Sequence, residues 1–385
     1  MLFQPPELDS QEEAVIARID EVRTALSYAV ASRRWTGVLA RMTVARNIQG
    51  SNSIEGYNVT IDDALAAEAN EEPLEAEGET WDALTGYRNA MTYILQLSDD
   101  PHFAFSRGLI RSLHYMMLQY DFTKHPGKWR PGPIFVRNDQ TGERVYEGPD
   151  AELVNGLAHE LVEYLNHPPT GVHPLVLAAM SHLDLVMIHP FADGNGRMGR
   201  ALQTLVLART GILSREFCSI EEYLGRNREE YYRVLSEVGA GSWHPERDAR
   251  PWVRFCLKAQ FRQASTLMRR ARVFQRVWDA LEHETKQRGL PDRTIGILGE
   301  AALGLKARNA TYRKHEDISE NLASRDLKML TDVGLLVPKG EKRGRYYIAA
   351  PILSAIGREA TARENKVIAD PFDLNGYLPG LAPLP

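Results

Sequence analysis

Apolar residues recur at every third or fourth position along most of this chain, which is the spacing of one face of a helix. The first such run covers residues 11–49, and its early apolar positions are Val15, Ile16, Ile19, Val22, Leu26 and Val30. The same period predicts further helices over 80–97, 106–120, 151–166, 173–188, 198–211, 227–238 and 250–286. The segment 173–188 is apolar nearly all round, so we expect it to be a central, buried helix. The pattern therefore predicts a mainly α-helical protein.

Two regions depart from the helical period. Residues 127–149 are rich in Gly and Pro and contain two short β-like pieces, 134–136 and 144–146, around an Asp-Gln-Thr-Gly turn, which predicts a hairpin-like flap. From residue 288 the chain reads as short helices followed by a strand over 335–337, a turn rich in Lys and Gly, and a strand over 346–349. Helix, helix and hairpin in this order are typical of a winged helix-turn-helix domain, predicted here over 288–350. Residues 351–385 are assigned to a C-terminal tail, in which Pro and Gly accumulate over 369–385.

Composition and charge narrow the class of protein. A length of 385 residues suggests two or three domains, and 43% hydrophobic with 25% charged residues is ordinary for a globular protein. No run of about 18 apolar residues occurs, so we expect no membrane span. The acidic, amphipathic N-terminus is unlike a signal peptide. The two cysteines, Cys218 and Cys256, suit a reducing cytoplasm and exclude a four-cysteine zinc site.

The charge of the C-terminal region differs from that of the whole chain. The formal net charge is -5, which argues against nucleic-acid binding over the whole surface. Residues 305–345, however, contain ten Lys and Arg against six Asp and Glu, a local net charge of +4. DNA contact through Arg325, Lys342, Arg343 or Arg345 is one interpretation. A domain that docks on protein or supports a dimer is the other, and the sequence leaves both open.

The segment HPFADGNGRMGR, residues 189–200, concentrates candidate chemistry. Pro190 ends the preceding helix and places His189 on a loop. Gly194 and Gly196 flank Asn195, so the backbone can turn tightly and present N–H groups at the start of the next helix, which is an anion site.

Three charged side chains of the same segment suit a bound phosphate. Arg197 and Arg200 fall on one face of the first helical turn, where they oppose the helix dipole unless they hold phosphates. Asp193 would be repelled by phosphate unless a divalent cation such as Mg²⁺ lies between them. His182, on the preceding helix, is interpreted as a core histidine.

A second short segment, SNSIEG at 51–56, presents a single carboxylate. Ser51 and Glu55 share a helical face, and Gly56 reads as a helix stop. Arg46 lies nine positions before Glu55, roughly on the opposite face of a continuous helix. The partner of Glu55 is therefore expected elsewhere in the chain, unless Glu55 is an ordinary solvated acid.

HPFADGNGRMGR resembles, without departure, the signature of the Fic family, H-P-F-x-[DE]-G-N-G-R-x-x-R. The likeness covers about residues 40–285 and includes the flap, the segment EEYLGRNREEYY at 221–232 and the helix near 252–255. It implies a Fic-type helical bundle with a small β-hairpin flap, and a cytoplasmic enzyme that transfers AMP from ATP to a Ser, Thr or Tyr hydroxyl. The implied domains are an N-terminal region 1–105 and a catalytic core 106–287.

Ser51, Glu55 and Gly56 resemble the inhibitory turn [ST]-x-x-x-E-[GN] that family members often carry. In the family this Glu pairs with the last Arg of the signature, here Arg200, and occupies the position that the γ-phosphate needs. The resemblance therefore implies a protein that restrains its own activity in cis.

The resemblance also implies roles for the remaining residues. His189 is the general base, Asp193 holds Mg²⁺, Gly194, Asn195 and Gly196 stabilise the transferred phosphoryl group, and Arg197 and Arg200 hold the β- and γ-phosphates. Ile134, Phe135 and Val136 dock the target protein. Val136, Arg137, Asn138 and Tyr231 contribute to the nucleotide site, although many members have Gly where this chain has Arg137 and Asn138, and Tyr231 and Tyr232 could equally belong to the core.

The sequence leaves several questions of function open. The same site could remove AMP from a modified protein, with Glu55 orienting a water. A nucleotide-sensing DNA-binding regulator is a third hypothesis, which loss of His189 or Asp193 would have favoured. Self-modification is expected, whereas the target, the base preference and a homodimeric state cannot be read from the sequence.

Overall fold

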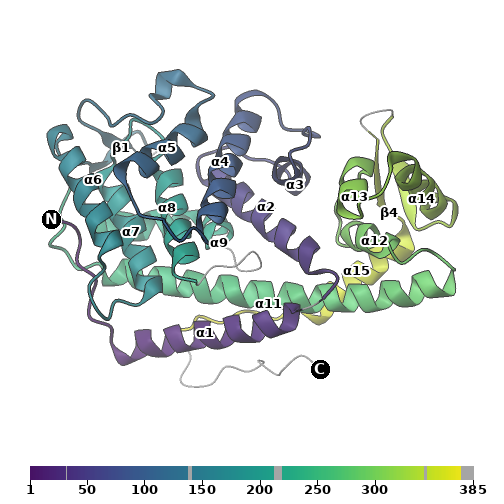
Figure 1. The fold of residues 1–385 in the computed structure, drawn as a ribbon. Coiled ribbons are helices and arrows are strands. Elements are labelled where there is room, and N and C mark those ends of the chain that lie inside the picture. The colour runs from purple at the N-terminus through teal and green to yellow at the C-terminus, as the bar shows by residue number, and fades with distance from the viewer. Residues whose placement is uncertain (32, 138–140, 212–218, 342–344, 374–385) are drawn as a thin grey trace.

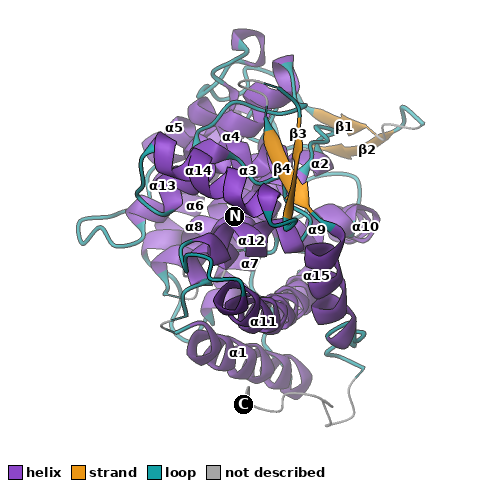
Figure 2. Cartoon of the chain, turned by 90° about the vertical axis from the view of Figure 1, so that its right-hand side faces the viewer, coloured by secondary structure: helices purple, strands orange, loops and turns teal. Residues whose placement is uncertain are grey.

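Helices dominate the computed structural model of the chain, which describes residues 1–31, 33–137, 141–211, 219–341 and 345–373. The longest of them, α11 (Arg250–Gln287), runs along both halves of the molecule (Figure 1). The helix α1 (Ser10–Val30) packs along it, side by side in both views (Figure 2). The prediction of a mainly α-helical protein is confirmed.

The run of 11–49, predicted as one helix, is two helices in the structure. After α1 the chain turns and α2 (Thr36–Ile54) begins at Trp35, whose buried ring stacks on Phe274 of α11 with 5.9 Å between centroids. The Trp35 indole N–H donates to Gln275, and the Val30 carbonyl at the end of α1 accepts from both the Thr36 hydroxyl and the Arg33 N–H. The break is therefore fixed by long-range anchoring of an aromatic residue, which helical periodicity does not report.

The remaining helices of the first two thirds of the chain form a bundle around α7. They are α3 (Ile61–Ala69), α4 (Gly78–Leu97), α5 (Arg107–Leu118), the 3₁₀ turn η1 (Phe122–Lys124), α6 (Ala151–Asn166), α7 (Pro174–Ile188), α8 (Asn195–Arg209), α9 (Glu221–Arg226) and α10 (Arg228–Gly239). Nearly every residue of α7 is buried, since α6, α8 and α11 all pack on it. This confirms the expected central helix. His182 on it bonds Gln203 and Tyr231, as expected of a core histidine.

The flap is a two-stranded antiparallel hairpin, β1 (Phe135–Arg137) and β2 (Arg144–Glu147), and Val136 lies opposite Tyr146. Its base is held because the Glu147 N–H donates to the Gly241 carbonyl at 3.0 Å and the Tyr146 hydroxyl donates to the Met187 carbonyl at 2.7 Å. The hairpin therefore stands over the end of α7.

The C-terminal region has the predicted order of elements: α12 (Thr294–Ala302), α13 (Asn309–His315), α14 (Glu320–Asp332), and the antiparallel pair β3 (Leu336–Lys339) and β4 (Tyr346–Ala349). Its assignment as a winged helix stays a prediction. The start of the predicted tail is a helix, α15 (Pro351–Arg363), which packs on α11 and α12. Gly357 allows this packing, because a Cβ there would lie 1.9 Å from the Ala302 carbonyl oxygen.

Two of the compositional expectations bear on particular residues. Within the described ranges, no helix has the length and apolarity needed to cross a bilayer. Cys256 is a buried free thiol, whereas Cys218 lies outside the described residues.

Candidate active site

His189 stands at the junction between α7 and the signature loop. α7 ends at Ile188, and His189 takes a left-handed conformation, with φ of 51°, directly before Pro190. Its Nδ1 lies 3.0 Å from the Val186 carbonyl oxygen, and because a carbonyl only accepts, Nδ1 carries the proton. The other ring nitrogen, Nε2, is then a free base. Burial lowers the pKa of His189, which favours this neutral form.

Three side chains lock the signature loop beneath His189. The side chain of Asn195 accepts from the Phe191 N–H and donates to the Phe191 carbonyl, both at 2.9 Å. The fully buried Phe191 ring stacks on His114 of α5, with centroids 3.7 Å apart. His114 accepts from the Gly127 N–H at 2.8 Å and contacts the Asp193 carbonyl at 2.9 Å. The Asn195 side chain is thus engaged in shaping the loop, which leaves its backbone N–H for an anion.

His114 is a residue that the sequence analysis missed. It fixes α5, the start of the flap and the loop to one another, and burial lowers the pKa of its imidazole to about 4, so it stays neutral. Its only sequence signal is a polar residue on the apolar face of the helix over 106–120.

Arg130 was missed as well. This buried guanidinium donates to the carbonyls of His189 at 2.8 Å, Gly132 at 2.6 Å and Pro149. It therefore ties both ends of the flap to the backbone of His189. A hint was available in the sequence, since a long cationic side chain stands in the segment with the most Gly and Pro.

The N-terminus of α8 has the geometry of an anion cradle. Gly194 caps the helix with φ of 76°, a conformation that suits Gly, and a helix leaves its first N–H groups without intrahelical partners. The side chains of Arg197 and Arg200 are both buried. Among the described residues, Nε and Nη1 of Arg197 and Nη1 of Arg200 have no hydrogen-bond acceptor. Buried cationic donors of this kind match the oxygens of a polyphosphate.

Glu55 lies in the same cradle. Its Oε1 accepts from Arg200 Nη2 at 2.6 Å, while Ser51 accepts from Arg200 through its hydroxyl at 2.8 Å and its carbonyl at 3.1 Å. The Arg200 side chain is wholly buried and that of Glu55 is 23% exposed. The partner of Glu55, which is absent from its sequence neighbourhood, is therefore Arg200 of α8.

The charges around this pair keep both groups ionised. Burial acts to raise the pKa of Glu55, but the positive charges of Arg200 and Arg197 outweigh it and the pKa falls. For Arg200 burial acts to lower the pKa, and Glu55 more than reverses this. The carboxylate also packs against the backbone, because a Cβ at Gly196 would lie 2.6 Å from Glu55 Oε1. A bound anion would have to compete with this carboxylate.

Asp193 is the candidate metal ligand. Its Oδ1 accepts from the Gly194 N–H at 2.6 Å, and its Oδ2 lies 3.7 Å from the Lys124 ammonium. The side chain is 43% exposed. The described residues contain no group of three His, Cys, Asp or Glu that could hold a metal ion by themselves. A cation here would need its other ligands from substrate phosphates and water, which is how Mg²⁺ is commonly bound.

The other predicted residues lie around this centre. Phe135 is exposed at 39%, Ile134 and Val136 are half-buried, and Arg137 donates to the Gly142 carbonyl at 3.0 Å. Asn138 lies outside the described residues. Gly56 lies just after the end of α2, with φ of 87°.

The two tyrosines that the sequence left open differ in exposure. Tyr231 is buried, with its hydroxyl 3.0 Å from His182 Nε2, so the structure places it in the core rather than on an open wall. Its neighbour Tyr232 is 46% exposed.

Comparison with known proteins bears on this arrangement. Residues 104–207 match the sequence model of the Fic/DOC family. The chain is 26% identical over 254 residues to a "Protein adenylyltransferase Fic" of Nematostella vectensis, covering 65% of this chain and 55% of that protein. It is 27% identical to the protein of the same description from Aedes aegypti, covering 62% of this chain and 44% of that protein. The chain thus spans about half the length of the curated relatives it matches.

Solved structures share the fold. A Fic family protein from Desulfovibrio desulfuricans superposes with a TM-score of 0.58 at 22% identity, over 90% of this chain and 98% of that one. Fic-1 from C. elegans superposes with a TM-score of 0.53 at 22% identity, over 67% of this chain and 72% of that one. The first of these similarities extends well beyond residues 104–207.

Proposed function

We propose that the protein transfers AMP from ATP to a hydroxyl group of a protein, releasing pyrophosphate, on the premise that residues 104–207, which match the Fic/DOC family model, work as such a domain. The supporting observation is the placement of an unprotonated ring nitrogen beside a buried cationic cradle. His189 Nε2 takes the proton of the attacking hydroxyl. The hydroxyl oxygen bonds the α-phosphorus while the bond from that phosphorus to the oxygen of the β-phosphate breaks.

The cradle would hold the nucleotide during this step. The backbone N–H groups at the start of α8, including those of Asn195 and Gly196, would face the charge on the transferred phosphoryl group. Arg197 and Arg200 would hold the β- and γ-phosphates through the donors that lack a protein acceptor. Asp193 would hold Mg²⁺, which when bound neutralises phosphate charge.

The flap would position the target. Among the described residues, β1 pairs only with β2, so its other edge is open to an extended segment of the target. Phe135 and its neighbours Ile134 and Val136 are presented at this edge, above the end of α7 that carries His189. Self-modification would use a hydroxyl of the chain itself in the same way.

We further propose that Glu55 restrains this activity. Its carboxylate holds Arg200 at 2.6 Å, where the γ-phosphate would need that side chain, and its negative charge would repel the phosphate. ATP would therefore bind poorly, or with its α-phosphate turned away from the attacking hydroxyl. Release requires that Glu55 leave Arg200.

The test is the initial rate of AMP transfer from labelled ATP at fixed Mg²⁺, with mass spectrometry of the products. Glu55→Gly should raise transfer, including self-modification, because it frees Arg200. Adding Arg200→Ala should lower the rate of Glu55→Gly by about 10²-fold or more, as expected when one charged contact to the transition state is lost.

Other results would point elsewhere. A Glu55→Gly rate at or below wild type would contradict self-inhibition and favour the alternative reaction, removal of AMP with Glu55 orienting a water. Absence of any labelled protein product from both variants would contradict AMP transfer itself.

A further inference from the structure

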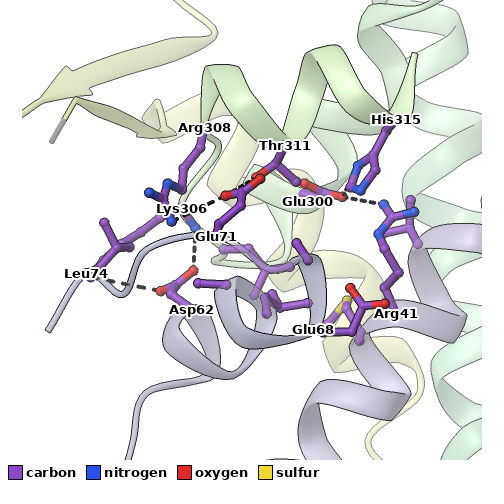
Figure 3. A pocket seen from close by; sticks show the side chains of 16 residues that line it. Arg41, Asp62, Glu68, Glu71, Leu74, Glu300, Lys306, Arg308, Thr311 and His315 are labelled. Carbon is purple, nitrogen blue, oxygen red and sulfur yellow. Dashed lines mark hydrogen bonds and ion pairs between the residues drawn. The ribbon is translucent and has the colours of Figure 1, made fainter. Parts of the chain in front are cut away.

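The C-terminal region contacts α2 and α3, the two helices next to the inhibitory turn. Figure 3 shows the contact: side chains of α12 and α13 meet those of α2 and α3 around a cavity of about 30 Å³. A space of this size holds no more than a water or two. The two parts of the chain are therefore closely packed here.

Opposite charges lie across the contact of the C-terminal region with α3 and with the segment 71–75 that follows it. The Lys306 ammonium lies 2.7 Å from a Glu75 oxygen, and its backbone N–H donates to Asp62 at 2.8 Å. Arg308 lies 3.4 Å from Glu71, whose two oxygens also accept from the Thr311 hydroxyl at 2.9 and 3.0 Å. The Arg308 and Glu71 side chains are only 17% and 12% exposed, so their attraction is less screened than that of a surface pair.

The end of α3 and the start of α2 are held too. Lys314 donates to the Ala69 carbonyl at 2.9 Å, which is one of the carbonyls that a helix leaves free at its C-terminus. Arg41 of α2 donates to Glu300 of α12 at 2.9 Å. The C-terminal region thus touches both helices that flank residues 51–60.

The residues that follow Glu55 connect α2 to α3, and the C-terminal region contacts both of these helices. Glu55 ends α2, and α3 begins at Ile61 after a cap by Thr60. The connection is short and tied back, since the Gln49 amide donates to the Val59 carbonyl at 2.8 Å. Movement of α3 away from the C-terminal region would therefore pull on the segment that seats Glu55 on Arg200.

We propose that the C-terminal region is a clamp, defined by Lys306, Arg308, Thr311 and Lys314, which binds α3 together with the acidic segment 71–75 that follows it and thereby holds Glu55 on Arg200. Opening the clamp shifts the population toward a state in which Glu55 has left Arg200, and AMP transfer rises. This regulation rests on the proposed function. It also gives these basic residues a use inside the protein, in place of contact with DNA.

Two charge reversals test the clamp in the full-length protein, by initial rate of AMP transfer. Arg308→Glu and Glu71→Lys each place like charges across the contact, and each should raise the rate about three- to tenfold, the latter corresponding to about 1.4 kcal/mol. The double variant restores opposite charges and should return most of the way to the wild-type rate. Amide hydrogen exchange over residues 51–69 should be faster in each single variant and slower again in the double.

A matched control is Lys328→Glu on α14, which breaks a solvent-exposed pair with Asp332 on the same region but away from α3. It should leave the rate within twofold of wild type. If Arg308→Glu does not fold, as judged by its thermal melt, Glu71→Lys examines the same contact from the α3 side.

The Glu55→Gly background separates failure of the clamp from failure of the proposed function. With Glu55 absent, Arg308→Glu should add nothing to the rate. Suppose that Glu55→Gly raises transfer, whereas Arg308→Glu and Glu71→Lys, made in the protein that retains Glu55, leave the rate at the wild-type level. The clamp is then wrong and self-inhibition stands. If Glu55→Gly does not raise transfer, self-inhibition is wrong and the clamp falls with it.

Discussion

Glu55 and Arg200 are separated by 145 positions in sequence and joined by a bond of 2.6 Å in the structure. A buried guanidinium is costly without a counter-charge, and breaking such a pair leaves a charge in a low dielectric. The signature loop therefore has two ways to satisfy Arg200: the carboxylate of Glu55 or the phosphate of a nucleotide. Inhibition and substrate binding are, on this proposal, competing solutions of one electrostatic problem.

His189→Ala should abolish AMP transfer and leave the fold intact. The side chain lies outside the helix and is half-buried, so its loss removes little packing, while loss of a general base typically costs about 10²- to 10⁴-fold in rate. His125→Ala is a matched control, since His125 has the same φ of 51° but is exposed at the end of η1. We would measure the rates in the Glu55→Gly background and melting temperatures of both variants. Retained transfer by His189→Ala would remove the general-base role.

The pH dependence of transfer should reveal the environment of His189. Burial is the largest influence and lowers its pKa, so the neutral, active form persists to a lower pH than an ordinary histidine with pKa of about 6.5 allows. Activity falls only as the pH drops through this lowered pKa. Since the charge of Glu55 acts to raise it, Glu55→Gly should move the acid limb of kcat/KM lower still. A limb at pH 7 or above would contradict this assignment.

Residues of the site were predictable where they are adjacent in sequence. His189, Asp193, Arg197 and Arg200 fall within one motif, and a loop followed by a helix start already implies an anion site. His114 and Arg130 were not predictable, because their role consists of bonds to backbone carbonyls that only the fold brings near. For Glu55 the turn was visible, but its partner came from the family resemblance rather than from spacing.

At the scale of the elements, seating of α2 depends on close contact with α9. Gly50 lies against the backbone there, since a Cβ on it would come within 2.6 Å of the Glu221 carbonyl oxygen. The Glu222 N–H donates to the Asn47 side chain at 3.0 Å, which fixes the register of the two helices. One residue further along α2, Ser51 accepts from Arg200.

Gly50→Ala should therefore push α2 away from α9 and loosen the three hydrogen bonds that Arg200 donates to Ser51 and Glu55. We expect a loss of about 1–3 kcal/mol in the free energy of unfolding, as for other overpacked sites, together with a raised rate of AMP transfer. Gly37→Ala is a matched control on the same helix, because its Cβ would meet only the flexible Arg41 side chain at 3.6 Å. Denaturant unfolding and initial rates of AMP transfer would be compared between the two variants. If Gly50→Ala lowers stability but leaves the rate unchanged, the position of α2 does not control the hydrogen bonds of Arg200.

Helices were predicted well where the apolar pattern of the segment itself shows them. They were predicted less well where a contact between residues far apart in sequence sets the helix boundary. The apolar character of nearly every position identified α7 as a buried helix, and the repeating apolar face identified α11. The break between α1 and α2 depends on Trp35 packing against Phe274, which lies far away in sequence. α15 was assigned to a tail although a Pro opens it in the favoured first turn, because the Pro- and Gly-rich stretch after it dominated the composition.

At the scale of the whole molecule, the local charge of +4 over 305–345 must be weighed against where the cations lie. Lys306 and Arg308 pair with Glu75 and Glu71 of the segment after α3, and Lys314 donates to the last carbonyl of α3. Arg313 and Lys328 pair with acids of their own region, at 3.0 Å from Glu320 and 2.8 Å from Asp332. The net charge of the sequence thus overstates the cationic surface that the folded chain offers.

We therefore expect the full-length protein to bind duplex DNA weakly. Six basic residues described over 305–345 are exposed. Arg313 and Lys328 are in ion pairs and Lys314 is bound to the Ala69 carbonyl, which leaves Arg325, Lys339 and Arg345, while Lys342 and Arg343 lie outside the described residues. Since each phosphate contact adds about one unit to the slope of log affinity against log salt, so few cations predict a shallow slope and a dissociation constant no tighter than about 10⁻⁶ M at physiological salt. Fluorescence anisotropy with random and palindromic duplexes over a salt series would measure both. Arg325→Glu, on α14, should change the affinity no more than Arg363→Glu on α15 does. Tight, salt-sensitive and sequence-dependent binding that Arg325→Glu abolishes would contradict this expectation and favour the hypothesis of a nucleotide-sensing DNA-binding regulator.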